Sequence, residues 1–183
     1  MKYLMLFADN FEDVEAIATY DVLVRGKESV DACSMNETKQ VKTKCGHTLI
    51  VNKTISEINR SDYDALIIPG GPASFNILCN LPIVDELISY FISSNKLVAS
   101  ICAAPFLLGR KGYLKDRNWT VHPGFEQYII GGNNHQELGV VVDKNIITAK
   151  SMFYSIEFGL AIYEYFHGLE ARNVLEESLK GNK

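Results

Sequence analysis

Cys102 is the residue whose type and position most favour chemistry. It follows the apolar run 96–101, which predicts a buried strand, and precedes residues 103–109, which predict a helix. At such a turn, unpaired backbone N–H groups and the positive end of the helix dipole stabilise a thiolate. This layout predicts a nucleophile elbow that carries sulfur. The alternative, left open by the spacing, is a small and inert core cysteine.

Three further groups are candidates to act with Cys102. Glu15 lies just inside a predicted helix and either points toward the sheet or only complements the helix dipole. Gly70-Gly71 forms either a turn that needs positive φ or a backbone that approaches a ligand and donates an N–H. His122 is the best partner for a Cys/His arrangement, although a lone histidine at a strand end is more often structural.

These residues must be positioned by elements that alternate along the chain. Continuous apolar runs separated by helices are typical of a parallel sheet covered on both faces. The sequence thus predicts a mostly parallel α/β fold of the doubly wound type, as a single domain over residues 1–183. The expected strands are 3–8, 29–34, 65–68, 96–101 and 119–121, the hairpins 41–51 and 138–148, and the helices 12–25, 83–93, 103–109, 155–166 and 170–179.

The loops at the carboxyl ends of three strands are expected to meet, because ligands bind at that edge of such sheets. They are residues 9–15, 69–72 and 101–103. Asn10 with Asp13 resembles a capping box for the first helix, and Gly109 is expected to end the helix after Cys102.

Composition restricts the function classes. The net charge of −4 and the pI near 5.6 argue against a nucleic-acid-binding face. No apolar run approaches the ~20 residues of a membrane helix, and the apolar start is too short for a signal peptide, so we expect a cytoplasmic protein. The cysteines, which lack metal-binding spacing, are expected to be free thiols without a structural metal: Cys33, Cys45, Cys79 and Cys102.

Five segments resemble the signature blocks of the DJ-one/ThiJ/PfpI superfamily, in the expected order and over nearly the whole chain. The resemblance implies a flavodoxin-like three-layer sandwich, usually a homodimer, with a reactive cysteine on an elbow. These segments are residues 8–15, 68–71, 99–105, 120–123 and 155–162.

By this resemblance, Cys102 is the nucleophile and Glu15 is the acid that hydrogen bonds to it. The backbone N–H groups of Gly71 and Ala103 are the oxyanion donors, whereas the role of His122 stays open. Burial and a thiolate neighbour both favour a protonated Glu15. Because Ala103 stands where protease-like members carry a histidine, the resemblance is to the DJ-one-like branch, and peptidase activity is not expected.

Two loops depart from the family pattern. Residues 72–75 replace a Gly-rich segment, and residues 150–154 replace a small Gly/Pro-rich loop. Both replacements are bulkier, so we expect them to narrow the pocket or change its selectivity.

The leading hypothesis is a cofactor-independent enzyme that acts on reactive dicarbonyls such as methylglyoxal and glyoxal, giving 2-hydroxy acids, or that deglycates their adducts. The alternative is an oxidative-stress sensor or chaperone with an oxidisable Cys102 and no significant turnover. A role in thiamine biosynthesis, a label carried by some relatives, is ranked low because the chain has no phosphate loop. The expected partners are a small aldehyde or dicarbonyl substrate and a second copy of the chain.

Overall fold

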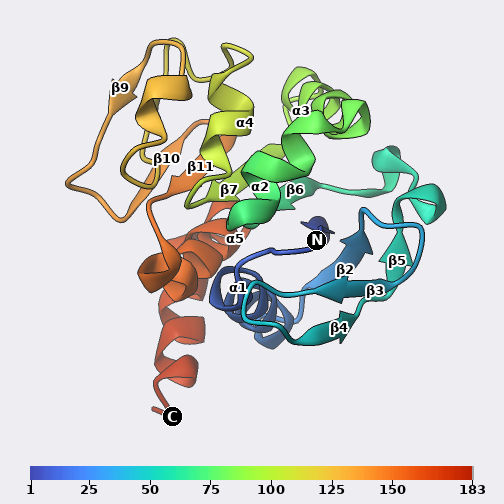
Figure 1. Cartoon of the computed structure of the whole chain (residues 1–183). Helices are drawn as coiled ribbons and strands as arrows, with labels where there is room; N and C mark the ends of the chain where they lie inside the picture. The colour runs from blue at the N-terminus through green and yellow to red at the C-terminus, as the bar shows by residue number, and fades with distance from the viewer. Residues whose placement is uncertain (183) are drawn as a thin grey trace.

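A computed structural model of the chain describes residues 1–182. Its centre is a seven-stranded sheet with the order β10-β11-β7-β6-β1-β2-β5 (Figure 1). All neighbouring strands are parallel except β10 and β11, which form an antiparallel hairpin. The strands are β1 (Lys2–Phe7), β2 (Ser29–Ser34), β5 (Lys53–Thr54), β6 (Ala65–Ile68), β7 (Leu97–Ile101), β10 (Val140–Asp143) and β11 (Ile146–Ala149).

Helices cover both faces of this sheet, which confirms the predicted flavodoxin-like α/β sandwich (Figure 1). On one face α1 (Asp13–Arg25) packs against α5 (Ser155–Leu179), and on the other α3 (Pro82–Ser93) packs against β6 and β7. Every residue of β6 and β7 is buried, as expected for strands covered on both sides. Two short helices, α2 (Pro72–Asn76) and α4 (Pro105–Gly109), follow these strands.

Two small two-stranded sheets and several short 3-10 turns lie outside the central sheet. The predicted hairpin at 41–51 is confirmed as β3 (Gln40–Lys42) and β4 (Thr48–Ile50), with Gly46 in the turn at a φ of 92°. The strand predicted at 119–121 is instead β8 (Asn118–Trp119), which pairs with β9 (Asn133–Asn134). The 3-10 turns are η1 (Ile55–Glu57), η2 (Arg60–Asp62), η3 (Leu78–Asn80), η4 (Glu126–Tyr128) and η5 (Met152–Tyr154).

The predicted start of the first helix is wrong, whereas the predicted end of the helix after Cys102 is confirmed. Asn10 does not cap α1, because its backbone is tied to Lys42 and Ala73 and takes a φ of 67°. Glu12 is the N-cap instead, and its side chain accepts the Glu15 N–H at 2.8 Å. Gly109 is the last residue of α4, as predicted, and a Cβ there would come within 2.5 Å of Ile129, so packing also requires the glycine.

The long C-terminal helix α5 is broken at Gly168, which has a φ of 80° and a ψ of 169°. The two helices predicted on either side of this residue are therefore present. No single helix within residues 1–182 has both the length and the apolar composition needed to cross a membrane.

Candidate active site at Cys102

Cys102 follows β7 directly and adopts a φ of 63°, in the left-handed region that L-residues avoid. Its N–H donates to the Ala149 carbonyl and its own carbonyl accepts the His122 N–H, both at 2.8 Å. α4 begins only at Pro105. A strained residue of this kind costs on the order of 1–3 kcal/mol, and neighbouring hydrogen bonds must hold it in place. The geometry agrees with the expected elbow.

Glu15 is buried beside this cysteine, with 1% of its surface exposed. Its Oε2 accepts the backbone N–H of Gly70 at 2.9 Å. Among residues 1–182, no hydrogen-bond donor serves its Oε1, and the carboxyl lies beside Cys102 because both groups pack closely against Gly70. The inner face of α1 thus directs Glu15 to the cysteine rather than to water.

The close approach of these groups depends on Gly70 and Gly71. A Cβ on Gly70 would lie 2.5 Å from Oε2 of Glu15 and 2.7 Å from Cβ of Cys102. Gly71 has a φ of 84°, and a Cβ there would lie 2.5 Å from the backbone nitrogen of Glu12. Real side chains never make such contacts, so both positions require glycine.

The backbone N–H groups of Gly71 and Ala103 lie near the Cys102 sulfur, and both oppose the rise in the pKa of its thiol. The same donors are positioned for negative charge that develops on or near this sulfur. The structure therefore brings together Cys102, Glu15, Gly71 and Ala103.

Burial and mutual contact shift both titrating groups. Burial raises the pKa of Glu15 from 4.5 to about 7, with a further rise from Glu12, against the opposing hydrogen bonds of Cys102 and Gly70. Burial also raises the pKa of the Cys102 thiol, and the Glu15 carboxylate raises it further. Placing a proton on Glu15 removes that second effect and leaves the N–H donors to stabilise a thiolate.

His122 contacts Cys102 through its main chain rather than its ring. Its Nδ1 lies 2.9 Å from the Pro123 carbonyl, and the side chain is exposed. Since a carbonyl oxygen only accepts, Nδ1 is the donor in this contact. The ring also meets Phe125 edge-on at 6.3 Å between centroids. The structure therefore does not join the imidazole to the pair of Glu15 and Cys102.

Sequence analysis missed a group of aromatic rings near this site. The sequence carried a signal for them, because an aromatic residue stands three or four positions after each of Gly71, Ala103 and His122. These residues are Phe75, Phe106 and Phe125, with Tyr128 beside them. Of the second bulky loop, Phe153 is 82% exposed, whereas Tyr154 packs over Gly139.

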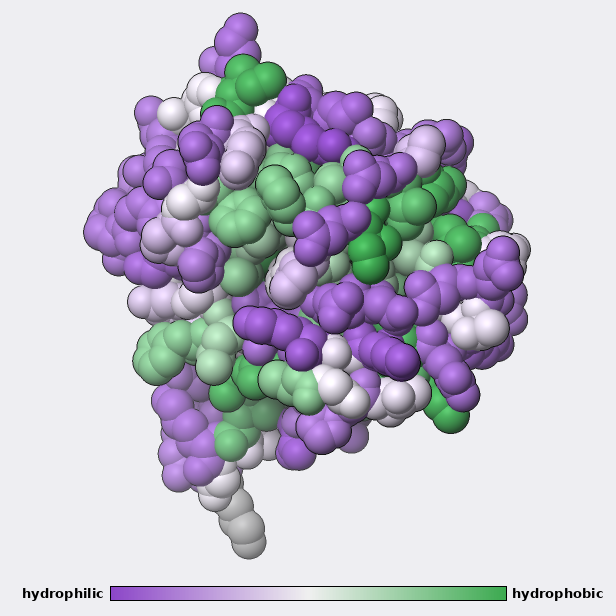
Figure 2. Space-filling view, viewed as in Figure 1, coloured by the Kyte–Doolittle hydropathy of each residue, from purple (hydrophilic) through white to green (hydrophobic). Residues whose placement is uncertain are grey.

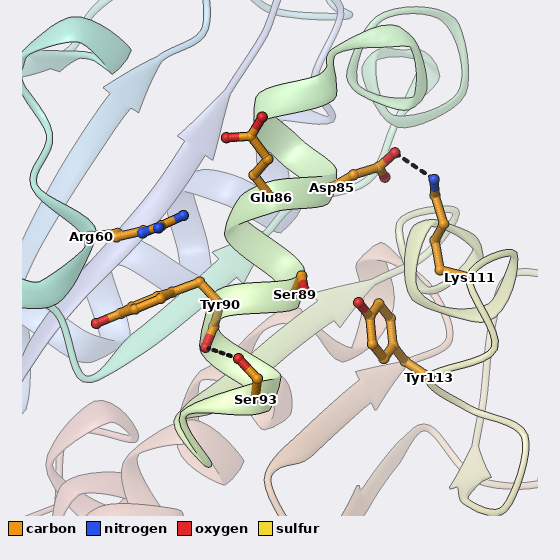
Figure 3. A pocket seen from close by; sticks show the side chains of 8 residues that line it. All are labelled: Arg60, Asp85, Glu86, Ser89, Tyr90, Ser93, Lys111 and Tyr113. Atoms are coloured by element: carbon orange, nitrogen blue, oxygen red, sulfur yellow. Dashed lines mark hydrogen bonds and ion pairs between the residues drawn. The ribbon is translucent and has the colours of Figure 1, made fainter.

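A separate hollow of about 500 Å³ lies along α3, away from this chemistry (Figure 3). Lys111 and Asp85 pair across part of it at 2.8 Å, and the Arg60 guanidinium lies 4.6 Å from the Tyr90 ring centroid. None of the residues around Cys102 lines it. Within residues 1–182, no three His, Cys, Asp or Glu side chains are grouped to hold a metal ion.

Comparisons with known proteins agree with this architecture. The model of the DJ-1/PfpI family matches residues 1–165. The chain is 30% identical over 176 residues to the glutathione-independent glyoxalase DJR-1.2 of Caenorhabditis elegans, covering 96% of this chain and 94% of that protein. It is 35% identical over 151 residues to a deglycase of Pyrococcus abyssi, covering 82% of this chain and 90% of that one.

Among solved structures, Drosophila melanogaster DJ-1beta superposes with a TM-score of 0.90 and 27% identity, covering 97% of this chain and 96% of that one. Sequence and fold agree along nearly the whole length. The chain therefore belongs to the DJ-1/PfpI family.

Proposed function

We propose that this protein is a cofactor-independent enzyme that converts reactive dicarbonyls, such as methylglyoxal and glyoxal, into 2-hydroxy acids. The observation that carries the proposal is the buried Glu15 carboxyl, which packs with Cys102 against Gly70. The backbone N–H groups of Gly71 and Ala103 lie near the sulfur. Relatives named glyoxalase and deglycase support the same class of substrate.

The first step is addition of the Cys102 sulfur to the aldehyde carbon. The reactive form has a proton on Glu15 and the negative charge on sulfur. As the C–S bond forms, the carbonyl electron pair moves to oxygen, near the N–H groups of Gly71 and Ala103. Glu15 then gives its proton to that oxygen, which leaves a hemithioacetal and a Glu15 carboxylate.

The second step moves hydrogen between the two carbons. The Glu15 carboxylate removes the proton from the first carbon, and the electron pair forms an enediolate. Glu15 returns the proton to the second carbon, and the hydroxyl proton of the first carbon passes to the oxygen of the second. The first carbon is oxidised to a thioester while the second is reduced to an alcohol, so no outside oxidant is needed. Water then displaces the Cys102 sulfur, releases the 2-hydroxy acid and returns a proton to Glu15.

Deglycation follows the same chemistry. An adduct of a dicarbonyl with an amine retains a carbonyl or hemiaminal carbon that the Cys102 sulfur can attack. At the hemiaminal carbon the C–S bond forms as the C–N bond breaks. Glu15 gives its proton to the departing amine, which leaves the same hemithioacetal and Glu15 carboxylate. Peptide hydrolysis is not part of the proposal, since Ala103 follows Cys102 and the His122 ring faces the Pro123 carbonyl.

The test is turnover of methylglyoxal without glutathione, followed by NMR as loss of dicarbonyl and gain of lactate. Wild type is expected to form lactate, and Cys102→Ser and Glu15→Gln are expected not to. Cys45→Ser is the matched control, because that thiol is exposed in the turn between β3 and β4. Full turnover in Cys102→Ser, or reversible binding without lactate in wild type, contradicts the proposal.

A second candidate is a peroxide sensor or stress chaperone that uses Cys102 without turnover. The specific support is that Cys102 is partly exposed and lies near the backbone N–H groups of Gly71 and Ala103, which oppose the rise in its pKa, whereas Cys33 is buried. Two equivalents of hydrogen peroxide would each transfer one oxygen to the sulfur and leave as water, giving a sulfinate. Intact-mass analysis after mild peroxide distinguishes a gain of two oxygens at Cys102 from scattered oxidation of all cysteines.

We further propose a cytoplasmic homodimer. The support is an apolar surface on α1 and the β3–β4 hairpin, where Val14, Ile17 and Ile50 expose 42%, 45% and 76% of their surface. Burying such a surface between two copies removes apolar area from water. Sedimentation equilibrium of wild type and Ile50→Asp tests this, and a monomeric wild type contradicts it.

A further inference from the structure

Phe75, Phe106, Phe125 and Tyr128 form one aromatic cluster. All pairs among these rings have centroid distances between 5.3 and 6.3 Å, in tilted or edge-to-face arrangements. Phe106 is buried at 5% exposure, whereas Phe75 and Tyr128 expose 39% and 44% of their surface. The cluster therefore has a buried base and an open face, and Figure 2 shows a hydrophobic patch over α2 and α4.

Two rings of the cluster, Phe75 and Phe106, lie close in the chain to Gly71 and Ala103, whose backbone N–H groups are near the Cys102 sulfur. Gly71 is the N-cap of α2, and Phe75 lies in this helix, so the two are about one helical turn apart. Phe106 is equally close to Ala103, because its N–H donates to the Ala103 carbonyl at 3.2 Å. The segments that surround the sulfur thus lead directly into the cluster.

A third ring approaches by a separate route. The His122 N–H donates to the Cys102 carbonyl, and the Phe125 N–H donates to the His122 carbonyl at 3.1 Å. The imidazole of His122 also meets the Phe125 ring edge-on. Three segments distant in sequence therefore converge on Cys102, and each contributes a ring to the same cluster.

The cluster has no charged side chain that could pair with an anionic ligand. Its own polar atom is the Tyr128 hydroxyl. The Arg110 guanidinium, 5.8 Å from the Phe106 ring centroid, is paired with Asp85 at 2.8 Å. Open ring faces and edges instead favour another aromatic group, which they contact in offset or edge-to-face geometry.

We propose that the aromatic cluster binds the substituent next to the reacting carbonyl, so that the enzyme prefers 2-oxoaldehydes that carry an aromatic ring. This inference rests on the proposed function of Cys102. The methyl group of methylglyoxal offers little area to the cluster, whereas the ring of phenylglyoxal covers the open faces of Phe75 and Tyr128. The cluster is thus a specificity determinant and takes no part in proton transfer.

The test compares kcat/KM for phenylglyoxal and methylglyoxal. Wild type is expected to favour phenylglyoxal by about tenfold, and Phe75→Ala to lower this ratio toward unity. Phe75→Leu retains an apolar side chain without the ring, and it is expected to lower the ratio while the protein stays folded. Tyr165→Ala is the matched control, because Tyr165 is 38% exposed on α5 and lies outside the cluster.

A second readout does not depend on turnover. N-phenylmaleimide and N-ethylmaleimide are compared at Cys102 by peptide mass spectrometry, with the exposed Cys45 as an internal reference. A phenyl preference at Cys102 over Cys45, reduced in Phe75→Leu, supports the cluster.

The two readouts separate the two proposals. If methylglyoxal is turned over and the wild-type ratio is near unity or unaffected by Phe75→Leu, the specificity inference fails while the proposed function stands. If neither dicarbonyl is turned over, the proposed function fails, and the maleimide comparison decides: equal preference at the two cysteines then overturns the aromatic site as well.

Discussion

Replacing Glu15 by Gln should change how the stability of the protein depends on pH. Glutamine has nearly the same shape, and its carbonyl oxygen can still accept the Gly70 N–H that Oε2 accepts at 2.9 Å. It differs from glutamate in remaining uncharged at every pH. The substitution therefore isolates the free energy of holding a charge at a site with 1% exposure.

The magnitude follows from the pKa. Burial raises the pKa of Glu15 from 4.5 to about 7, so between these values the folded chain binds more protons than the unfolded chain. The stability associated with the protonated carboxyl is full below pH 4.5 and is lost as pH rises through about 7. At about 1.4 kcal/mol for each unit of pKa, the loss is about 3 kcal/mol.

Glu15→Gln and wild type should consequently be equally stable near pH 4.5. At pH 8 the variant should be more stable by about 3 kcal/mol, or by roughly 6 to 12 °C in Tm for a chain of this size. Urea unfolding at several pH values between 4.5 and 8 measures the difference, and Glu126→Gln at an exposed position is the control. A stability difference that does not grow with pH refutes the argument that Glu15 is a buried acid with a raised pKa.

Other substitutions test the remaining geometry. Gly70→Ala should destabilise the fold by about 1–3 kcal/mol and lower activity, because its Cβ would come within 2.7 Å of Glu15 and Cys102. Thermal unfolding measures the loss of stability and lactate formation the loss of activity. A substitution that changes neither would contradict the close packing. His122→Ala should reduce kcat/KM by less than the ~100-fold typical of losing a general base, since only its main chain contacts Cys102. Gly168→Ala should cost about 1–2 kcal/mol through its φ of 80° while activity persists; unchanged Tm would show that the break in α5 needs no glycine.

Local sequence patterns were sufficient for every strand of the central sheet except the short edge strand β5, and for most of the helices. β6 and β7 are continuous apolar runs, and burial on both faces is the condition under which such runs occur. Helix ends were predicted less well. Asn10 has the side chain of a good cap, yet its backbone is held by Lys42 and Ala73, which come from other parts of the chain.

The sequence also determined which residues were candidates for chemistry, because a cysteine after a buried strand and a glutamate in the first turn of a helix are local features. Only the tertiary structure decided their contact and protonation. The pKa of Glu15 depends on burial under Gly70 and on the Cys102 thiol, neither of which is near it in sequence. Likewise, the orientation of the His122 ring and the meeting of four aromatic rings arise from packing between distant segments. The spacing of the aromatic residues is visible in the sequence, but the spacing alone does not show that their rings meet.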